Sequence, residues 1–256
     1  MHPIELAGTG PREANTFFEQ APQSPPLLQF DEVQLNERTL EAARIIAQNS
    51  ADPRATAYDM LRTQILQSLD AENRRLLVVT SPTMGCGKTV TSLNLALSIA
   101  RQKQRPVFLV DMDFRKPQLA KRLGIDFAVG LSDVLSGRAS LDEAILKLRV
   151  GPYETLFLPT RAADGSSELI SSRPMKAFIQ SLRTIFQSHL VILDMPPMLV
   201  SDDVIGILPH TDSVLLITAA GASTIPEVEE CMRHLHSSNL VRIVVNKVPK
   251  SKKRYY

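Results

Sequence analysis

The stretch SPTMGCGKTV (81–90) decides how the rest of this 256-residue sequence is interpreted. Two glycines are followed by a lysine and a hydroxyl, and the stretch lies between the apolar run LLVVT (76–80) and a segment with helical periodicity. A strand, a glycine-containing turn, a lysine and a helix, in that order, form the pattern of a phosphate-binding loop. We therefore expect a nucleotide phosphate here, although Pro82 stands where the usual pattern has its first glycine.

Each part of this loop has an expected task. Glycines let the backbone wrap a phosphate closely, and the loop amides together with the helix N-terminus form a positive nest. Lys88 is expected to contact the β- and γ-phosphates, and Thr89 to bind Mg²⁺. A thiol in such a nest, as in Cys86, is either reactive or an inert residue that fills the turn. The residues expected to line the nucleotide are Thr83, Met84, Gly85, Cys86, Gly87, Lys88, Thr89 and Val90.

Short apolar runs alternate with helical stretches after residue 75. Such alternation is typical of a parallel sheet covered by helices on both faces. The expected strands are 76–80, 106–111, 155–159, 190–194, 213–219 and 241–246, and the expected helices lie near 88–103, 117–123, 141–148, 173–187 and 225–237. We predict an α/β fold with a doubly wound, mostly parallel sheet, of the phosphate-loop NTPase kind. Its ligand should lie outside the carboxyl ends of the strands.

Two further motifs place carboxylates at strand ends. In VFLVDMDFRKP (107–117), Asp111 and Asp113 are two residues apart, and strand alternation predicts that both face the crevice. Such a pair can order the water shell of a magnesium ion and accept a proton from an attacking hydroxyl. In LVILDMPP (190–197), Asp194 ends a wholly apolar strand, where a carboxylate is costly unless it is paired or near a metal. The expected catalytic residues are Lys88, Asp111, Asp113 and Asp194, and the expected metal-binding residues are Thr89, Asp111, Asp113 and Asp194.

The composition sets limits on the class of protein. A net charge of only +2 argues against a dedicated nucleic-acid binder. Two cysteines make no disulfide framework, which favours a reducing cytoplasm. The first residues lack the pattern of a signal peptide, and no apolar stretch approaches the ~18 to 20 residues needed to cross a bilayer. We expect a cytoplasmic protein that reaches a membrane only through a partner or a surface contact.

The chain divides into three expected parts. Residues 1–54 are interpreted as an N-terminal arm, partly disordered, with a short amphipathic helix at 37–49. The catalytic domain is expected to span residues 55–248, beginning with a helix that ends near residue 69. Residues 249–256 form a basic tail that carries two tyrosines.

The three motifs, taken in this order, resemble those of the bacterial tyrosine kinase family of polysaccharide export, whose phosphate loop lacks the first glycine. They are SPTMGCGKT, VDMDFRKP and VILDMPP. The resemblance implies ATP and Mg²⁺ as cofactors. It also implies a catalytic domain recruited to the inner face of the membrane by an activating polysaccharide co-polymerase. The family phosphorylates tyrosines of a neighbouring copy in trans, which here makes Tyr255 and Tyr256 the expected acceptors. By analogy with related ATPases, Asn246 is expected to touch the adenine.

The sequence departs from the family pattern at several points, so other functions stay open. TAYDMLR (56–62) keeps only Arg62 of the family's oligomerising helix. Five of the last eleven residues are Lys or Arg, which indicates either a solvated terminus or attraction to an anionic membrane, with no specific nucleic acid expected. The alternatives are a non-kinase ATPase switch in the same pathway and, less favoured, a cargo- or DNA-positioning ATPase. Such positioning ATPases carry a lysine where this chain has Thr83.

Overall fold

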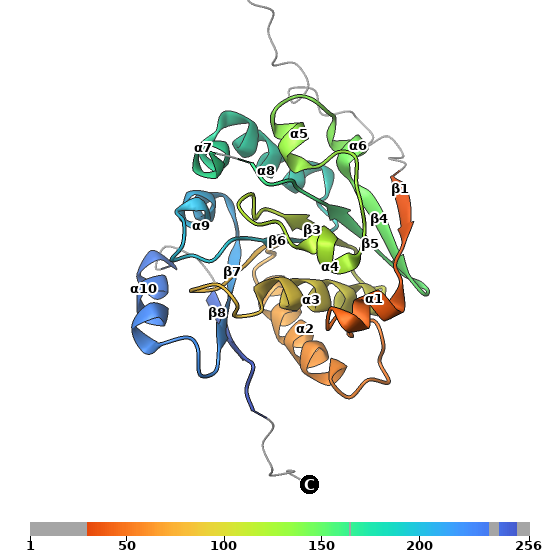
Figure 1. The fold of residues 1–256 in the computed structure, drawn as a ribbon, viewed down its shortest axis with the longest axis vertical. Helices are drawn as coiled ribbons and strands as arrows, with labels where there is room; N and C mark the ends of the chain where they lie inside the picture. Colours follow the sequence, from red (N-terminus) through yellow and green to blue (C-terminus); the bar gives the residue numbers. More distant parts are fainter. Residues whose placement is uncertain (1–29, 164, 236–240, 250–256) are drawn as a thin grey trace, which may run out of the picture.

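The computed structural model describes residues 30–163, 165–235 and 241–249, which form one eight-stranded sheet with helices on both faces (Figure 1). The strands are β1 (Asp31–Gln34), β2 (Leu76–Thr80), β3 (Val107–Asp111), β4 (Leu146–Val150), β5 (Tyr153–Leu158), β6 (Leu190–Asp194), β7 (Ser213–Ala219) and β8 (Val241–Asn246). The helices are α1 (Glu37–Ala42), α2 (Ala55–Asp70), α3 (Lys88–Gln102), α4 (Leu119–Leu123), α5 (Leu131–Leu135), α6 (Leu141–Ala144), α7 (Ser166–Ser171), α8 (Arg173–Ile185), α9 (Asp203–Ile207) and α10 (Ile225–Leu235), with a 3₁₀ turn, η1 (Leu208–His210).

The sheet has the strand order β1-β4-β5-β3-β6-β2-β7-β8. Its neighbours are parallel except β4 and β5, which form an antiparallel hairpin, so that β4 and β1 run against the other strands. Every residue of β2, β3, β6 and β7 is buried, as expected for parallel strands that are covered on both faces. The predicted doubly wound, mostly parallel fold is confirmed.

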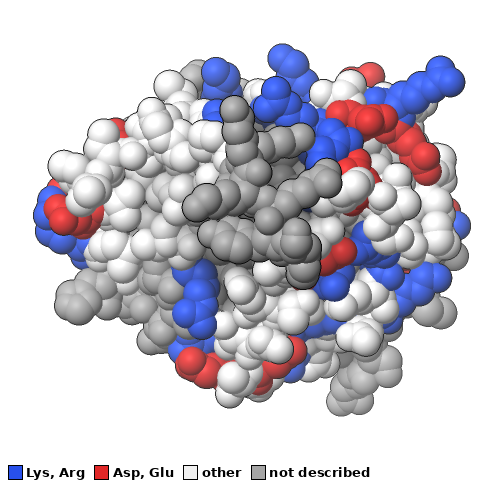
Figure 2. Space-filling model, turned by 90° about the horizontal axis from the view of Figure 1, so that it is seen from below, with Lys and Arg blue, Asp and Glu red and all other residues white. Residues whose placement is uncertain are grey.

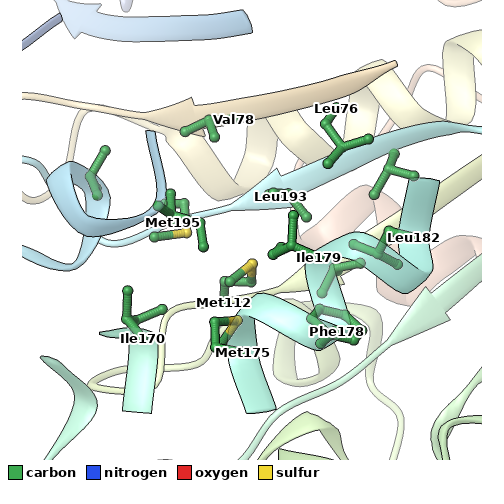
Figure 3. Close-up of a cluster of buried hydrophobic side chains, with 14 of the residues drawn as sticks. Leu76, Val78, Met112, Ile170, Met175, Phe178, Ile179, Leu182, Leu193 and Met195 are labelled. Atoms are coloured by element: carbon green, nitrogen blue, oxygen red, sulfur yellow. The ribbon is translucent and has the colours of Figure 1, made fainter. Parts of the chain in front are cut away.

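The helices divide between the two faces of the sheet. Side chains of α1 to α4 pack in one apolar cluster with residues such as Leu77 and Ile192. Side chains of α5 to α10 pack in the other cluster, where Ile179 of α8 lies beside Leu193 of β6 (Figure 3). Burial of apolar surface on both faces therefore holds the central strands in place, at ~25 cal/mol per Å² removed from water.

The two acidic motifs are anchored in the second of these clusters. Met112, Phe114 and Met195 are fully buried there, and Met112 and Met195 lie among the side chains of Figure 3. Each lies next to a motif aspartate in the sequence. The apolar residues thus fix the backbone at the point where the strands β3 and β6 end.

The expected N-terminal arm ends earlier than predicted. Residues 30–54 belong to the main domain, because β1 pairs with β4. Asn94 of α3 fixes the segment after α1: its Oδ1 accepts from the amides of Ile46 and Ala47 at 2.8 and 3.0 Å, and its Nδ2 donates to the carbonyl of Arg44. These contacts end the helix expected at 37–49 after Ala42. Residues 1–29 lie outside the described residues.

The helix expected at 141–148 is also wrong. A helix of one turn, α6, begins with a capping box between Ser140 and Glu143 and ends at Ala144. Ile145 is extended, and the following LKLRV alternates buried and more exposed side chains, which is the pattern of a strand. These five residues therefore form the strand β4 and do not continue the helix.

The face drawn in Figure 2 shows no wide field of one charge among the described residues. Seen from below, Lys and Arg side chains are interspersed with Asp and Glu around the rim of the face, with broad uncharged stretches between them (Figure 2). This mixture agrees with the net charge of +2. Within residues 30–163, 165–235 and 241–249, none of the helices combines the length and the apolar character that a membrane span requires.

Candidate nucleotide site

The three motifs meet at the carboxyl ends of neighbouring strands. β6 lies between β3 and β2 in the sheet, and Asp194 at its end is in register with Asp111 of β3 and Val79 of β2. The phosphate loop follows β2 directly, and α3 begins at Lys88. Because parallel strands end at the same edge, residues far apart in the sequence come together there.

The loop has the geometry that an anion requires. Gly85 and Gly87 have φ of +81° and +98°, in the left-handed region that favours glycine. Gly87 is the N-cap of α3, and no side chain caps the amides of the first turn. A Cβ added at Gly85 meets no atom within 4 Å. A phosphate therefore fits this helix start, where uncapped amides and the helix dipole favour negative charge.

Pro82 fastens the beginning of the loop to the third motif. Its carbonyl accepts from the amide of Leu199 at 3.1 Å, and the neighbouring carbonyl of Ser81 accepts from Met198 at 2.8 Å. The hydroxyl of Thr80 donates to the carbonyl of Pro196 at 2.7 Å. None of these contacts needs a glycine or an amide at position 82, so a proline is compatible with the loop.

Lys88 lies among carboxylates at the base of the site. Its Nζ is 3.0 Å from Asp113 Oδ2 and 3.8 Å from Asp194 Oδ2. Burial disfavours its charge, but the carboxylates of Asp194 and Asp113 outweigh that effect, so the pKa of Lys88 is raised. Asp194 is 1% exposed and accepts from Ser92 Oγ at 2.9 Å. Burial raises the pKa of Asp194 against the opposing effect of Lys88.

The two aspartates of the second motif have different surroundings. Both oxygens of Asp111 accept backbone hydrogen bonds, from the amides of Asp113 at 3.2 Å and Leu119 at 3.1 Å. Burial, with the nearby charge of Asp194, raises the pKa of Asp111 well above its usual range. Asp113 follows the strand and lines the pocket, whereas Asp111 does not. The prediction that both carboxylates face the crevice is therefore correct only for Asp113.

The pocket around Lys88 combines basic and apolar side chains. Its lining includes Arg115, Lys116 and Arg122 together with the exposed Met84 and Val200. Sequence analysis missed Lys116, Arg122 and Val200 as lining residues. The run RKPQLAKR (115–122) carried a signal for the first two, because it holds several cations directly after the acidic pair.

Arg115 extends from this pocket toward α7 and α9. Its Nε lies 3.3 Å from Oδ2 of Asp203, a carboxylate whose side chain is fully buried, and its Nη2 lies 3.2 Å from Ser167 Oγ. The pair connects the second motif to the start of α9. The acidic SDD (201–203) held no sequence signal for this contact, since the partners are 88 residues apart.

Comparison with known proteins agrees with this geometry. Residues 77–256 match the family model described as the CobQ/CobB/MinD/ParA nucleotide binding domain. The chain belongs to this family.

Within the family, its relatives are bacterial tyrosine-protein kinases, so the resemblance drawn from the three motifs is confirmed. EpsB of Ralstonia solanacearum, provisionally named as a tyrosine-protein kinase, is 33% identical over 195 residues, which are 76% of this chain and 26% of EpsB. This chain thus spans about a quarter of the length of that curated relative.

Two solved structures show the same fold. The BceF tyrosine kinase domain is 26% identical with a TM-score of 0.69, and the match covers 88% of this chain and 94% of that domain. The septum site-determining protein MinD of Pyrococcus horikoshii, solved with Mg-ADP, is 24% identical with a TM-score of 0.54, over 70% of this chain and 72% of MinD. The MinD likeness shows the fold alone.

Some residues expected to line the nucleotide lie elsewhere. Three of them, Thr83, Cys86 and Asn246, are not among the lining residues of the pocket. The pocket is lined by the other six, which are Met84, Gly85, Gly87, Lys88, Thr89 and Val90. Cys86 is 2% exposed, and its Sγ lies 3.3 Å from the carbonyl of Thr83. This burial favours the filling role for the thiol. Tyr255 and Tyr256, the expected acceptors, lie outside the described residues.

The aspartates do not form a ready-made metal cage. Among the described residues no group of three or more His, Cys, Asp and Glu side chains is arranged to hold a metal ion. Magnesium in phosphate-loop enzymes is held by a loop hydroxyl, waters and the substrate phosphates rather than by such a cage. Thr89, 3.5 Å from Lys88 Nζ, fits that arrangement, with Asp194 nearby.

Proposed function

We propose that this protein is an ATP- and Mg²⁺-dependent protein-tyrosine kinase that regulates the polymerisation and export of an exopolysaccharide or capsule. One observation carries the proposal: a lysine and three buried carboxylates lie together at the uncapped start of α3. The kinase names of its relatives support the reaction class, and the nucleotide binding domain that its family model describes supports a nucleotide cofactor.

The loop and Lys88 bind and orient the phosphates in this proposal. Backbone amides at the start of α3 surround the anion, and Lys88 leaves its carboxylate partners to contact the β- and γ-phosphates. Thr89 and Asp194 would hold Mg²⁺, which neutralises phosphate charge when bound. Asp194 acts from a fixed position, because Ser92 donates to it and burial immobilises it.

Asp113 is the residue we assign to the proton of the tyrosine hydroxyl. A tyrosine has a pKa near ~10, so transfer needs a base or a cation close to the oxygen. Asp113 is the carboxylate that lines the pocket, and its Oδ1 is held by the amide of Lys116 at 2.9 Å. Asp111 orients it, since Asp111 Oδ1 accepts from the Asp113 amide. In this proposal Asp113 acts directly on the tyrosine hydroxyl, and Asp111 supports Asp113.

The acceptors we propose are Tyr255 and Tyr256 of a second copy. β8 ends at Asn246, and Tyr256 lies ten residues further on, at most ~35 Å along an extended chain. That length is enough to enter a neighbouring site. We further propose a membrane polysaccharide co-polymerase as activator, and attraction of the basic tail to the anionic inner face of the membrane, at ~1 kcal/mol per basic residue.

A mixing experiment tests the transfer. Lys88→Ala protein with an intact tail is combined with active protein carrying Tyr255→Phe and Tyr256→Phe, in ATP, Mg²⁺ and the cytoplasmic segment of the partner. We expect phosphotyrosine on the Lys88→Ala protein by mass spectrometry. Lys121→Ala, which removes an exposed lysine outside the pocket, serves as the control and should phosphorylate itself like wild type.

A second function is favoured by one observation. Arg62, the residue kept from the family's oligomerising helix, is buried and donates to Ser98 of its own chain. An ATPase switch that does not build the family's assembly would fit this arrangement. If the mixture hydrolyses ATP while the Lys88→Ala protein stays unlabelled, the switch replaces the kinase. The cargo- or DNA-positioning ATPase ranks lowest because Thr83 stands at the position of its lysine.

A further inference from the structure

Asn246 joins the last strand to the phosphate loop across an intervening strand. It ends β8, and β7 separates β8 from β2, the strand that leads into the loop. Its Nδ2 nevertheless donates to the carbonyl of Cys86 at 2.9 Å. The side chain therefore bridges the carboxyl end of β7 and holds the loop at the peptide that joins Cys86 to Gly87.

The orientation of the Asn246 amide is fixed at both ends. Its Oδ1 accepts from the backbone amide of Lys247 at 2.7 Å, opposite in polarity to the bond with Cys86. Lys247 has φ of +57°, a left-handed conformation uncommon for a residue other than glycine. An amide offers a donor and an acceptor together, whereas a carboxylate offers only acceptors at neutral pH.

The two glycines of the loop differ in what lies beside them. A Cβ at Gly87 would stand 2.3 Å from Asn246 Nδ2, a distance that atoms do not tolerate, whereas a Cβ at Gly85 would meet open space. Both glycines line the nucleotide pocket, but Asn246 and Cys86 do not. Asn246 thus approaches the loop outside the pocket lining and is in close contact with its backbone.

From this geometry we propose that Asn246 is a positioning residue that holds the Cys86–Gly87 peptide, and with it the loop amides, in the conformation that receives phosphate. The proposal rests on the nucleotide-binding function proposed above. It differs from the expected contact with adenine, because a residue that positions the loop affects every ligand carrying the phosphates, with or without a base.

The experiment compares a nucleotide with a ligand that has no base. Calorimetry on the full chain measures the affinity of Mg·ATP and of Mg·tripolyphosphate for wild type and Asn246→Ala. We expect both affinities to fall by the same factor, roughly fivefold, for the loss of one hydrogen bond and the loosening of the loop. Asn246→Ser, whose side chain is one bond shorter, is expected to lose affinity for both ligands in the same way. It replaces Asn246→Ala in the experiment if the alanine variant does not fold.

The matched control is Thr218→Val. Thr218 Oγ1 donates to the carbonyl of Val244 at 3.1 Å, so this variant also removes a side-chain bond between β7 and β8 but leaves the loop untouched. Its affinities should change less than twofold, even if its melting temperature falls like that of Asn246→Ala.

Three results would overturn the positioning role. A loss confined to Mg·ATP makes Asn246 a base-reading residue. Unchanged affinity for both ligands, or equal losses in Thr218→Val, makes the bond merely structural. If wild type binds neither ligand, the proposed nucleotide function itself fails, and the positioning role fails with it.

Discussion

Helix α3 carries a cluster of charged side chains near each of its ends, buried at the start and partly buried at the end, and the two clusters differ in their balance of charge. Near its start, one cation faces three carboxylates; near its end, two cations face one carboxylate. The members near the start are Lys88, Asp111, Asp113 and Asp194, and those near the end are Asp59, Arg62 and Arg101.

In the cluster near the end of α3, the one carboxylate has two cationic partners. Asp59 of α2 accepts from Arg101, Arg62 and Ser98, and Arg62 also donates to the carbonyl of Ser98. Burial opposes the charge of Asp59, but these hydrogen bonds and cations outweigh it, so the pKa of Asp59 is lowered. Such a cluster braces two helices against each other and leaves no carboxylate in surplus.

The cluster at the start of α3 has more carboxylates than cations. Lys88 is the cation that its three carboxylates share, and burial raises the pKa values of Asp111 and Asp194. The cluster near the end of α3 has no carboxylate in surplus, whereas a surplus of buried carboxylates indicates a site that a further cation completes. Three substitutions sharpen or break this contrast.

The largest effect is expected for Asp194→Asn. The amide keeps an oxygen for Ser92 but removes one buried charge of the surplus. Mg²⁺-dependent turnover should fall by roughly two orders of magnitude, because the charge that supports the metal is lost. Without nucleotide the melting temperature should rise by about 2–4 °C, the equivalent of about 1 kcal/mol. Steady-state ATPase assays and calorimetric melting measure both.

Asp202, an exposed carboxylate outside the cluster at the start of α3, provides the control substitution. Asp202→Asn removes a surface carboxylate that accepts from Ser167, and it should leave turnover near that of wild type. A melting temperature that falls in Asp194→Asn, together with unchanged turnover, would show that the start of α3 is a structural cluster like its end.

Arg101→Ala should have the second largest effect, and this effect should be on stability and not on turnover. It removes a main partner of Asp59 and should lower the free energy of unfolding by ~2 kcal/mol. This loss is smaller than that expected on breaking a fully buried ion pair, because Asp59 is partly exposed. The affinity for Mg·ATP should stay the same. Urea denaturation and calorimetry measure these quantities.

Arg105→Ala is the matched control for this brace. Arg105 pairs with Asp70, whose side chain is 64% exposed, so its loss should cost less than ~1 kcal/mol. If Arg101→Ala and Arg105→Ala cost the same, the end of α3 is not a brace. A weaker affinity for Mg·ATP in Arg101→Ala would contradict the separation of the two clusters.

A dependence on pH is the smallest expected effect. The folded pKa of Asp59 is lowered below its ordinary value of 3.8, so its contribution to stability is complete above pH 3.8 and is lost as pH falls through the folded value. Asp59→Asn lacks this contribution. The difference in free energy of unfolding between wild type and Asp59→Asn should therefore stay constant above pH 3.8 and shrink as pH falls below it. A difference that stays constant below pH 3.8 would contradict the lowered pKa.

Much of this site could be predicted from the sequence because its parts are local. A loop between a strand and a helix fixes Lys88, and the apolar runs before Asp111 and Asp194 fix the strand ends that bring them together. The order of motifs also pointed to the right family. Local pattern thus places the carboxylates at the right strand ends, although it does not show which of them faces the pocket.

The remainder depended on contacts across the sequence. Asn94 holds the segment after α1 through bonds that span 47 and 48 residues, and no local period reveals them. Arg115 pairs with Asp203 at the start of the distant helix α9, and Asn246 reaches Cys86 over 160 residues. The strand β4 was misassigned because a one-turn helix adjoins it. Single side-chain contacts of this kind decide which carboxylate faces a ligand and which only supports it.

Isothermal calorimetry of ATP, with and without Mg²⁺, on wild type and Lys88→Ala tests the central claim most directly. If the start of α3 is a nucleotide site, wild type binds ATP and binds it more tightly with Mg²⁺. Lys88→Ala should lose at least tenfold in affinity, ~1.4 kcal/mol, because the cation that meets the phosphates is gone. Equal affinity in wild type and Lys88→Ala would contradict the site, whatever the protein does with its tyrosines.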